Sequence, residues 1–158
     1  ATCDWCPVPV IAKEVGFGLD VGSAKVLIDA GVDVLDVAGR GGTRFADIEI
    51  AMNAEIQQRL SDQQLFDGWG YTTVECLQMM QSSFPTQCYW ASGGVRHGLD
   101  VAKALCLGAS AVGIAGRFLK PATESTESVY SSYDPYNTKI AASSSYLWDQ
   151  IICNHDSY

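Results

Sequence analysis

Short apolar runs alternate along the chain with glycine-rich turns and with stretches whose apolar residues recur at helical spacing. Four runs predict strands, over Val8–Val15, Val32–Ala38, Gln87–Ala91 and Ala109–Ala115. Helical spacing predicts helices over Asp20–Ala30, Ala46–Leu60, Thr73–Ser82 and Leu99–Leu107. A strand followed by a helix and another strand forms a right-handed crossover, so this order predicts a parallel sheet.

Individual residues mark where the helices begin and end. Asp20 is a candidate N-cap of the first helix, and Gly31 is expected to end it. After the last predicted strand, Arg117–Lys120 predicts a short helical turn that Pro121 stops.

The number of these units limits the architecture. Four units in about 120 residues average ~30 residues each, and a complete (β/α)8 barrel needs roughly twice this chain. The prediction is therefore an α/β fold with the four strands of half a TIM barrel, over residues 1–121. Residues 122–158 hold eight Ser and five of the seven Tyr, and we expect an irregular or partly helical tail there.

Composition and charge limit which partners and which cellular compartment we expect. Ten Lys and Arg stand against 18 Asp and Glu, giving a net charge of -8, and no basic run interrupts this balance. We therefore expect neither nucleic acid nor an anionic membrane as a partner. The chain has no apolar stretch of the ~18 residues that a membrane span needs. Six cysteines among 158 residues are too few for a disulfide scaffold, which favours the cytoplasm.

Two glycine turns follow consecutive predicted strands and suit a phosphate group. Ser92-Gly93-Gly94 leads into a helix, and Ala115-Gly116 opens the next helical turn. Helix N-termini and free backbone N–H groups bind anions, and the guanidinium of Arg96 adds a positive charge. The alternative is that these glycines only make tight turns.

Two further segments are candidates for the same edge of the sheet. Lys13 lies inside the first predicted strand, where its ammonium can donate to an anionic ring or pair with an acid at a solvated edge. Gly41-Gly42-Thr43 offers backbone donors and a hydroxyl group, and Thr43 is also a candidate N-cap for the helix that follows.

Other catalytic classes are not indicated. The chain has no HExxH, EF-hand or GxxxxGK[ST] motif. His97 and Asp100 lack a Ser or Cys nucleophile on a strained turn, so the pattern does not favour triad chemistry.

Six ordered segments of the chain carry a resemblance to a known family. They are Val10–Gly18, Asp36–Phe45, Trp69–Thr73, Ala91–Arg96, Leu99–Ala109 and Ala115–Lys120. Together they resemble the carboxyl-terminal half of type 2 isopentenyl-diphosphate isomerases, which are FMN-dependent TIM barrels. The resemblance implies that Lys13 and Thr43 contact FMN. It implies that the FMN phosphate is held by Gly93, Gly94, Val95, Arg96, Ala115 and Gly116.

The resemblance also implies a reaction. The family interconverts isopentenyl and dimethylallyl diphosphate with reduced FMN as an acid/base agent and Mg2+ on the diphosphate. Its substrate-facing residues and its metal-binding carboxylate lie in the half that has no match here, so no catalytic residue and no metal ligand is assigned. Tyr71-Thr72-Thr73 departs from the family by replacing a proline-containing turn, and the tail after Lys120 departs as well.

Two alternatives remain at this point. One is an FMN-linked oxidoreductase of the α-hydroxy-acid oxidase type or a relative of IMP dehydrogenase. The second strand disfavours the oxidase, because Ala38-Gly39-Arg40 stands where that class has a catalytic His, and no Cys loop suits the dehydrogenase. Another is an inactive half-barrel that binds FMN or phosphate, or serves only as an assembly unit.

The half-barrel itself implies a protein partner. The first and fourth strands would expose unpaired backbone groups, and the inner face of the sheet would expose apolar side chains. A homodimer that pairs first strand with fourth strand closes eight strands. The other possibilities are closure by a complementing chain or by the chain's own tail.

Overall fold

The computed structural model describes residues 5–53, 66 and 68–132 of the 158-residue chain. In these ranges four strands form one sheet, β1 (Ile11–Lys13), β2 (Val34–Asp36), β3 (Cys88–Ala91) and β4 (Ala111–Val112). All neighbouring strands are parallel and lie in chain order, β1-β2-β3-β4. The predicted parallel α/β sheet is confirmed.

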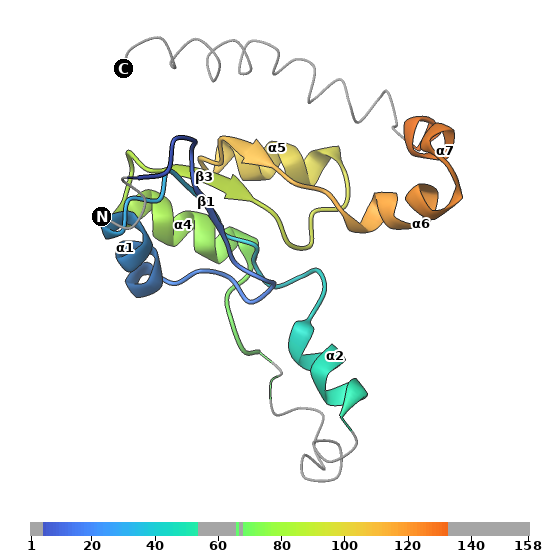
Figure 1. The fold of residues 1–158 in the computed structure, drawn as a ribbon, viewed down its shortest axis with the longest axis horizontal. Coiled ribbons are helices and arrows are strands. Elements are labelled where there is room, and N and C mark those ends of the chain that lie inside the picture. The colour runs from blue at the N-terminus through green and yellow to red at the C-terminus, as the bar shows by residue number, and fades with distance from the viewer. Residues whose placement is uncertain (1–4, 54–65, 67, 133–158) are drawn as a thin grey trace.

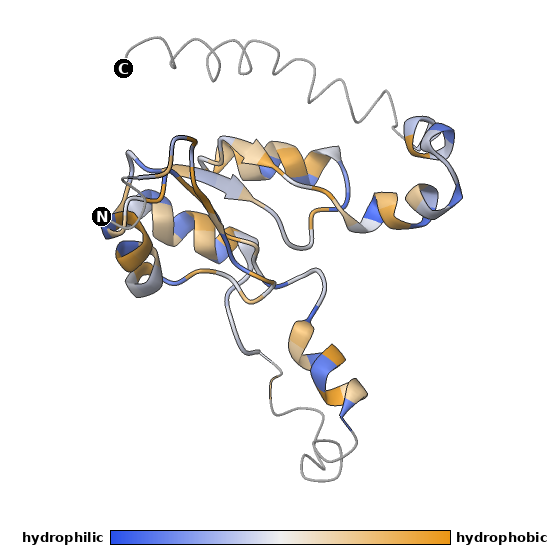
Figure 2. Ribbon diagram, in the orientation of Figure 1, coloured by the Kyte–Doolittle hydropathy of each residue, from blue (hydrophilic) through white to orange (hydrophobic). Residues whose placement is uncertain are grey.

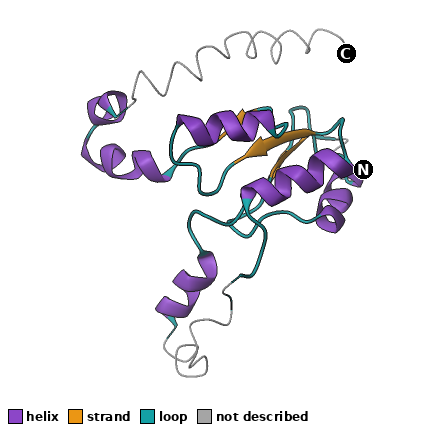
Figure 3. Ribbon diagram, turned by 180° about the vertical axis from the view of Figure 1, so that it is seen from behind, coloured by secondary structure: helices purple, strands orange, loops and turns teal. Residues whose placement is uncertain are grey.

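The helices alternate with these strands (Figure 1). α1 (Val21–Asp29) connects β1 to β2, α4 (Thr73–Ser83) precedes β3, and α5 (Gly98–Cys106) connects β3 to β4. Three further helices are α2 (Phe45–Met52), α6 (Gly116–Glu124) and α7 (Thr126–Ser131). Figure 3 shows α1, α4 and α5 lying along the sheet, while α2 and the α6–α7 pair project away from it.

The structure differs from the predicted bounds of the strands and of α2. Each strand is shorter than predicted, and the edge strand β4 keeps only two of the seven residues Ala109–Ala115. α2 ends at Met52 because Asn53 has extended backbone angles, and residues 54–60 of the predicted helix lie outside the described residues.

The prediction that Pro121 stops the helical turn is wrong. α6 runs through Pro121 as far as Glu124. A proline at the sixth position removes one N–H, while its fixed φ suits a helix, so the turn continues with one hydrogen bond fewer. Most of the tail, from residue 133, lies outside the described residues.

Side-chain caps fix where two of the helices begin. The Asp20 carboxylate accepts hydrogen bonds from the backbone N–H groups of Gly22 and Ser23, at 2.8 and 3.1 Å. At α4, Thr72 and Glu75 form a capping box, in which each side chain binds the backbone N–H of the other residue. The predicted N-cap Asp20 is confirmed, as is Gly31, which follows α1 with a φ of 89°.

One face of the sheet carries the hydrophobic core. Leu35, Val37, Tyr89 and Ala91 point to this face and are fully or almost fully buried against α4 residues Cys76, Leu77 and Met80. The Tyr89 hydroxyl donates to the carbonyl oxygen of Met80 at 3.0 Å. Burial raises the pKa of the Cys76 thiol to about 11, so this thiol is a packing group and not a nucleophile.

The opposite face of the sheet is open and has two layers. The strand register aligns Ile11, Val34 and Cys88 in one layer, and Lys13, Asp36, Trp90 and Ala111 in the next. Ile11 is 44% exposed and Trp90 is 37% exposed. Figure 2 shows hydrophobic segments, in orange, on the helices α1 and α5 that lie along the sheet. The layer that contains the charged residues Lys13 and Asp36 lies toward the carboxyl ends of the strands, where the glycine turns begin.

Replacing Asp20 by Ala is expected to lower the free energy of unfolding by about 1 kcal/mol, because two backbone N–H groups at the start of α1 lose their acceptor. Hydrogen bonds, first from the Ser23 hydroxyl, hold the pKa of Asp20 below the ordinary value of 3.8 for this carboxyl group. The contribution is therefore present above about pH 4 and is lost as the pH falls through the folded-state pKa. Urea unfolding between pH 3 and pH 7 measures both effects.

The control is Asp29→Ala, which removes the exposed pair with Lys25 at the other end of α1. That pair is worth only a few tenths of a kcal/mol. Equal losses in the two variants would contradict the capping role of Asp20.

Candidate functional site

The turns that follow β2 and β3 pack against each other through glycine backbone. Gly93 has a φ of +89°, and a Cβ there would overlap the carbonyl oxygen of Gly39. A Cβ on Gly42 would stand 3.1 Å from the backbone nitrogen of Gly94. The Gly39 N–H donates to the Ser92 carbonyl at 3.1 Å, which fastens the two turns together. Side chains are excluded from this contact, so backbone groups line the space around it.

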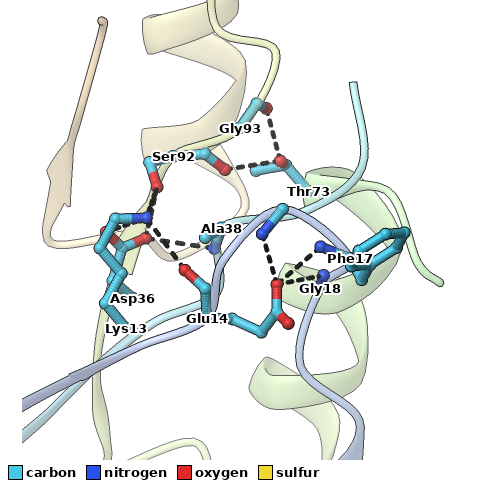
Figure 4. Close-up of polar contacts among 10 residues, drawn as sticks. Lys13, Glu14, Phe17, Gly18, Asp36, Ala38, Thr73, Ser92 and Gly93 are labelled. Atoms are coloured by element: carbon cyan, nitrogen blue, oxygen red, sulfur yellow. Dashed lines mark hydrogen bonds and ion pairs between the residues drawn. The ribbon is translucent and has the colours of Figure 1, made fainter. Parts of the chain in front are cut away.

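Lys13 is held at the same edge by groups from three strands (Figure 4). Its ammonium donates to the Glu14 carbonyl oxygen at 3.0 Å and to the Ser92 hydroxyl at 3.3 Å. Asp36 Oδ2 lies 3.7 Å from the same nitrogen. The Lys13 side chain is still 57% exposed, which leaves the ammonium open to a ligand above the sheet.

Asp36 connects the ends of β1, β2 and β3. It is only 6% exposed, and its Oδ1 accepts from the Ser92 hydroxyl at 2.7 Å and from the Ala38 N–H at 3.2 Å. Ala38 has a φ of 34°, a left-handed conformation that is uncommon outside glycine. Asp36 thus fixes a strained turn and a lysine at one point, as is common at functional sites.

Glu14 shapes the turn after β1. Its Oε2 accepts hydrogen bonds from the backbone N–H groups of Gly16, Phe17 and Gly18, at 2.7, 2.6 and 2.9 Å (Figure 4). The carbonyl of Phe17 then accepts from the Tyr71 N–H at 2.7 Å. One carboxylate therefore closes the first turn and presents it to the segment before α4.

The predicted phosphate-binding turn has donors without acceptors. Among the residues that the structure describes, no acceptor is bonded to the backbone N–H groups of Gly93, Gly94 and Val95. The Arg96 side chain is exposed, while its backbone N–H donates to Asp100 at 3.1 Å. The guanidinium is thus the part of Arg96 that remains for an anion.

The other predicted site residues lie on the same edge. Thr43 is exposed, and Arg44 takes the N-cap position of α2 with no side-chain hydrogen bond that caps the helix, so Thr43 is not the cap that the sequence suggested. Ala115 precedes α6 and Gly116 begins it, and both are exposed after β4. A Cβ on Gly113, before them, would stand 3.4 Å from the Ser92 side chain. The turns after β3 and β4 are therefore neighbours.

Sequence reasoning missed two residues of this site. Asp36 was part of a predicted strand, and Thr73 was the start of a predicted helix, but neither was a site candidate. The alternation of side chains along a strand indicated the position of Asp36, because the register places it beside Lys13 on the open face. Nothing in the sequence marks Thr73, whose contacts with Ser92 and Gly93 form only in the folded chain.

The described residues contain no cluster of three or more His, Cys, Asp or Glu side chains suited to a metal ion. Within these same ranges, no helix combines the length and the apolar character that a membrane span requires.

Comparison with known proteins identifies the family. Residues 2–129 match the model of the FMN-dependent dehydrogenases. The chain belongs to this family. The family is built on the TIM barrel, so the four described strands are part of such a barrel.

Individual relatives share a more specific name. An isopentenyl-diphosphate delta-isomerase of Vibrio campbellii is 46% identical over 128 residues, which cover 80% of this chain and 37% of the relative. One of Bacillus pumilus is 48% identical over 120 residues, 76% of this chain and 32% of the relative. One of Streptococcus pyogenes serotype M1 is 48% identical over 114 residues, 72% and 32%. The resemblance seen in the sequence is confirmed, and the chain spans about a third of these relatives' length.

The residues of this edge fit the flavin mononucleotide of the family. A phosphate group needs hydrogen-bond donors and positive charge, and the turn at Gly93 supplies free N–H groups next to Arg96. The buried Arg40 Nε, in the facing turn, also has no hydrogen-bond partner among the described residues. An electron-rich ring edge needs a donor, and the Lys13 ammonium is fixed and exposed.

The contact between the two turns predicts an order of stability for three glycine variants. Gly93→Ala combines left-handed strain with backbone overlap and is expected to cost roughly 3 kcal/mol. Gly68→Ala has a similar φ of +82° in open space and is expected to cost about 1 kcal/mol. Gly116→Ala meets neither condition and is expected to cost nothing. Urea midpoints that do not separate Gly93→Ala from Gly68→Ala would show that the close contact is unimportant.

Proposed function

We propose that the carboxyl-terminal edge of the sheet binds FMN. The phosphate is held by Gly93, Gly94, Val95 and Arg96, with Ala115 and Gly116 from the next turn. The observation that carries this proposal is the row of N–H groups at Gly93, Gly94 and Val95 that have no acceptor in the described part of the chain, beside the exposed guanidinium of Arg96. The family match supports FMN as the cofactor.

The ring of the flavin lies, in this proposal, over Lys13 and Thr43. Lys13 donates to the electron-rich edge of the ring, and its position is kept by Ser92 and Asp36. The negative charge of the buried Asp36 offsets the positive charge of Lys13, so the net charge near the ring is small. The direction in which Lys13 donates is fixed. Thr43, exposed beside Gly16, offers its hydroxyl from the neighbouring turn.

The reaction proposed for the complete barrel is the isomerisation of isopentenyl diphosphate to dimethylallyl diphosphate. The names of the relatives support it. Reduced FMN would supply acid/base chemistry at the allylic carbons. Mg2+ on the diphosphate is part of the proposal, although no metal-binding cluster occurs among the described residues. We therefore propose that this chain binds the cofactor and that turnover requires groups from outside these strands.

The open face of the sheet is the proposed surface for the missing strands. Within the described ranges β1 and β4 each pair on one side only, and Ile11 and Trp90 lie exposed on the face that a barrel would enclose. A second copy fits this surface, because four strands and four strands give the eight of a TIM barrel. We prefer the homodimer to a separate complementing chain.

The proposed compartment is the cytoplasm. The cysteines within the described residues, Cys6, Cys76, Cys88 and Cys106, are free thiols, as a reducing compartment maintains them.

Arg96→Ala is expected to raise the Kd for FMN about tenfold, because one charge-assisted contact to the phosphate is lost. Titration by quenching of flavin fluorescence measures this, and riboflavin, which lacks the phosphate, should bind both proteins equally. The matched control is Lys103→Ala, because Lys103 is an exposed cation in the last turn of α5, the helix that follows Arg96. An unchanged FMN affinity in Arg96→Ala would overturn the phosphate assignment.

Light scattering of the full chain is expected to give about twice the chain mass of 17.0 kDa, because an open half-barrel exposes two strand edges and an apolar face. The dimeric state should be retained after deletion of residues 122–158, with a mass twice that of the shortened chain. A dilution-stable mass near 17.0 kDa would exclude the dimer. Turnover of isopentenyl diphosphate by such a monomer would contradict the need for further strands.

A further inference from the structure

The sequence of the glycine turn after β3 does not fix the direction in which one of its peptide groups points. Two consecutive glycines have little steric preference, so the peptide between Gly93 and Gly94 is able to point its N–H to either side. Both residues have positive φ angles, +89° and +75°. Close packing against Gly39 and Gly41 requires glycine at both positions, but it does not by itself fix the direction of this peptide.

A buried hydroxyl group fixes that direction. Thr73, the first residue of α4, is 8% exposed, and its Oγ1 donates to the carbonyl oxygens of Ser92 and Gly93, at 2.8 and 2.7 Å (Figure 4). The single hydroxyl proton is therefore shared between two successive carbonyl groups. The Ser92 carbonyl also accepts from the Gly39 N–H, whereas the Gly93 carbonyl accepts from Thr73 alone within the described residues.

The geometry of the peptide bond gives the consequence. In a trans peptide the N–H points opposite to the C=O. Because Thr73 draws the carbonyls of Ser92 and Gly93 to its own side, the N–H groups of Gly93 and Gly94 point away from it. These are two of the N–H groups without an acceptor on the proposed phosphate side.

We propose that Thr73 is a positioning residue for phosphate recognition, which orients the Ser92–Gly93 and Gly93–Gly94 peptides so that the N–H groups of Gly93 and Gly94 face the anion. This inference rests on the proposed FMN site, but Thr73 contacts no ligand itself. It assigns to the start of α4 a role beyond packing, and it makes the affinity for the phosphate depend on a side chain behind the turn.

Thr73→Val tests the proposal, because Val has the shape of Thr without the hydroxyl. The Kd for FMN is expected to rise about tenfold, since the half-buried Gly93 carbonyl loses its donor and the peptide is released. The Kd for riboflavin should not change, and Thr73→Ser should restore FMN binding. The matched control is Thr72→Val, which removes the neighbouring hydroxyl of the capping box. It should lower the melting temperature without changing the ratio of the two affinities.

A second measurement does not depend on flavin binding. In the ligand-free, 15N-labelled chain, the amide resonance of Gly94 is expected to move or broaden in Thr73→Val but not in Thr73→Ser or Thr72→Val. The Gly108 amide, in a turn on the opposite edge, serves as the reference. If the Gly94 resonance responds but the parent chain does not bind FMN, the proposed function fails and the orientation by Thr73 stands. A Gly94 resonance unchanged in Thr73→Val, or an unchanged ratio of FMN to riboflavin affinity, would overturn the inference.

Discussion

The contact between the backbones of Gly39 and Gly93 is the constraint on which the carboxyl-terminal edge of this sheet depends. No side chain fits between these turns, so their peptide groups define the surface that a ligand meets. Two parallel strands that end side by side bring the turns together, and the Gly39 N–H fastens them at Ser92. The fold thus creates a surface of backbone donors where an acidic chain otherwise offers little to an anion.

Buried side chains behind this surface determine what it presents. Asp36 gathers the Lys13 ammonium, the Ser92 hydroxyl and the Ala38 N–H at the ends of three strands. Thr73 fixes the carbonyls of the next turn from the opposite side. Both residues are buried. Each acts by holding other groups that are open to solvent. In the proposed FMN site, the phosphate side and the ring side are therefore arranged by separate buried residues, so variants of Thr73 and of Lys13 should weaken contacts to different parts of the cofactor.

The fold was predictable from the sequence to the extent that it is local. Alternating apolar runs gave the order of strands and helices, and Asp20 and Gly31 marked the ends of α1 because caps depend on neighbouring residues. Strand lengths were overestimated, since pairing stops where an edge strand such as β4 lacks a second neighbour. The course of α6 through Pro121 was also missed. Of the site, the glycine turns and Lys13 were predictable. Asp36 acts across 56 residues of sequence and was marked only by its position on the strand, and Thr73 acts across 19 residues and carries no local pattern.

The central claim is that the turns on this edge bind FMN through backbone donors that are already in place. Amide chemical-shift changes in the 15N-labelled chain on addition of FMN test it most directly. We expect the largest changes at Gly41–Thr43, Gly93–Arg96 and Ala115–Gly116, with little change at Gly31 and Gly108, the glycines that follow α1 and α5 on the opposite edge. Changes that centre on Gly31 and Gly108, or no change at Gly93 and Gly94 at saturating FMN, would contradict it.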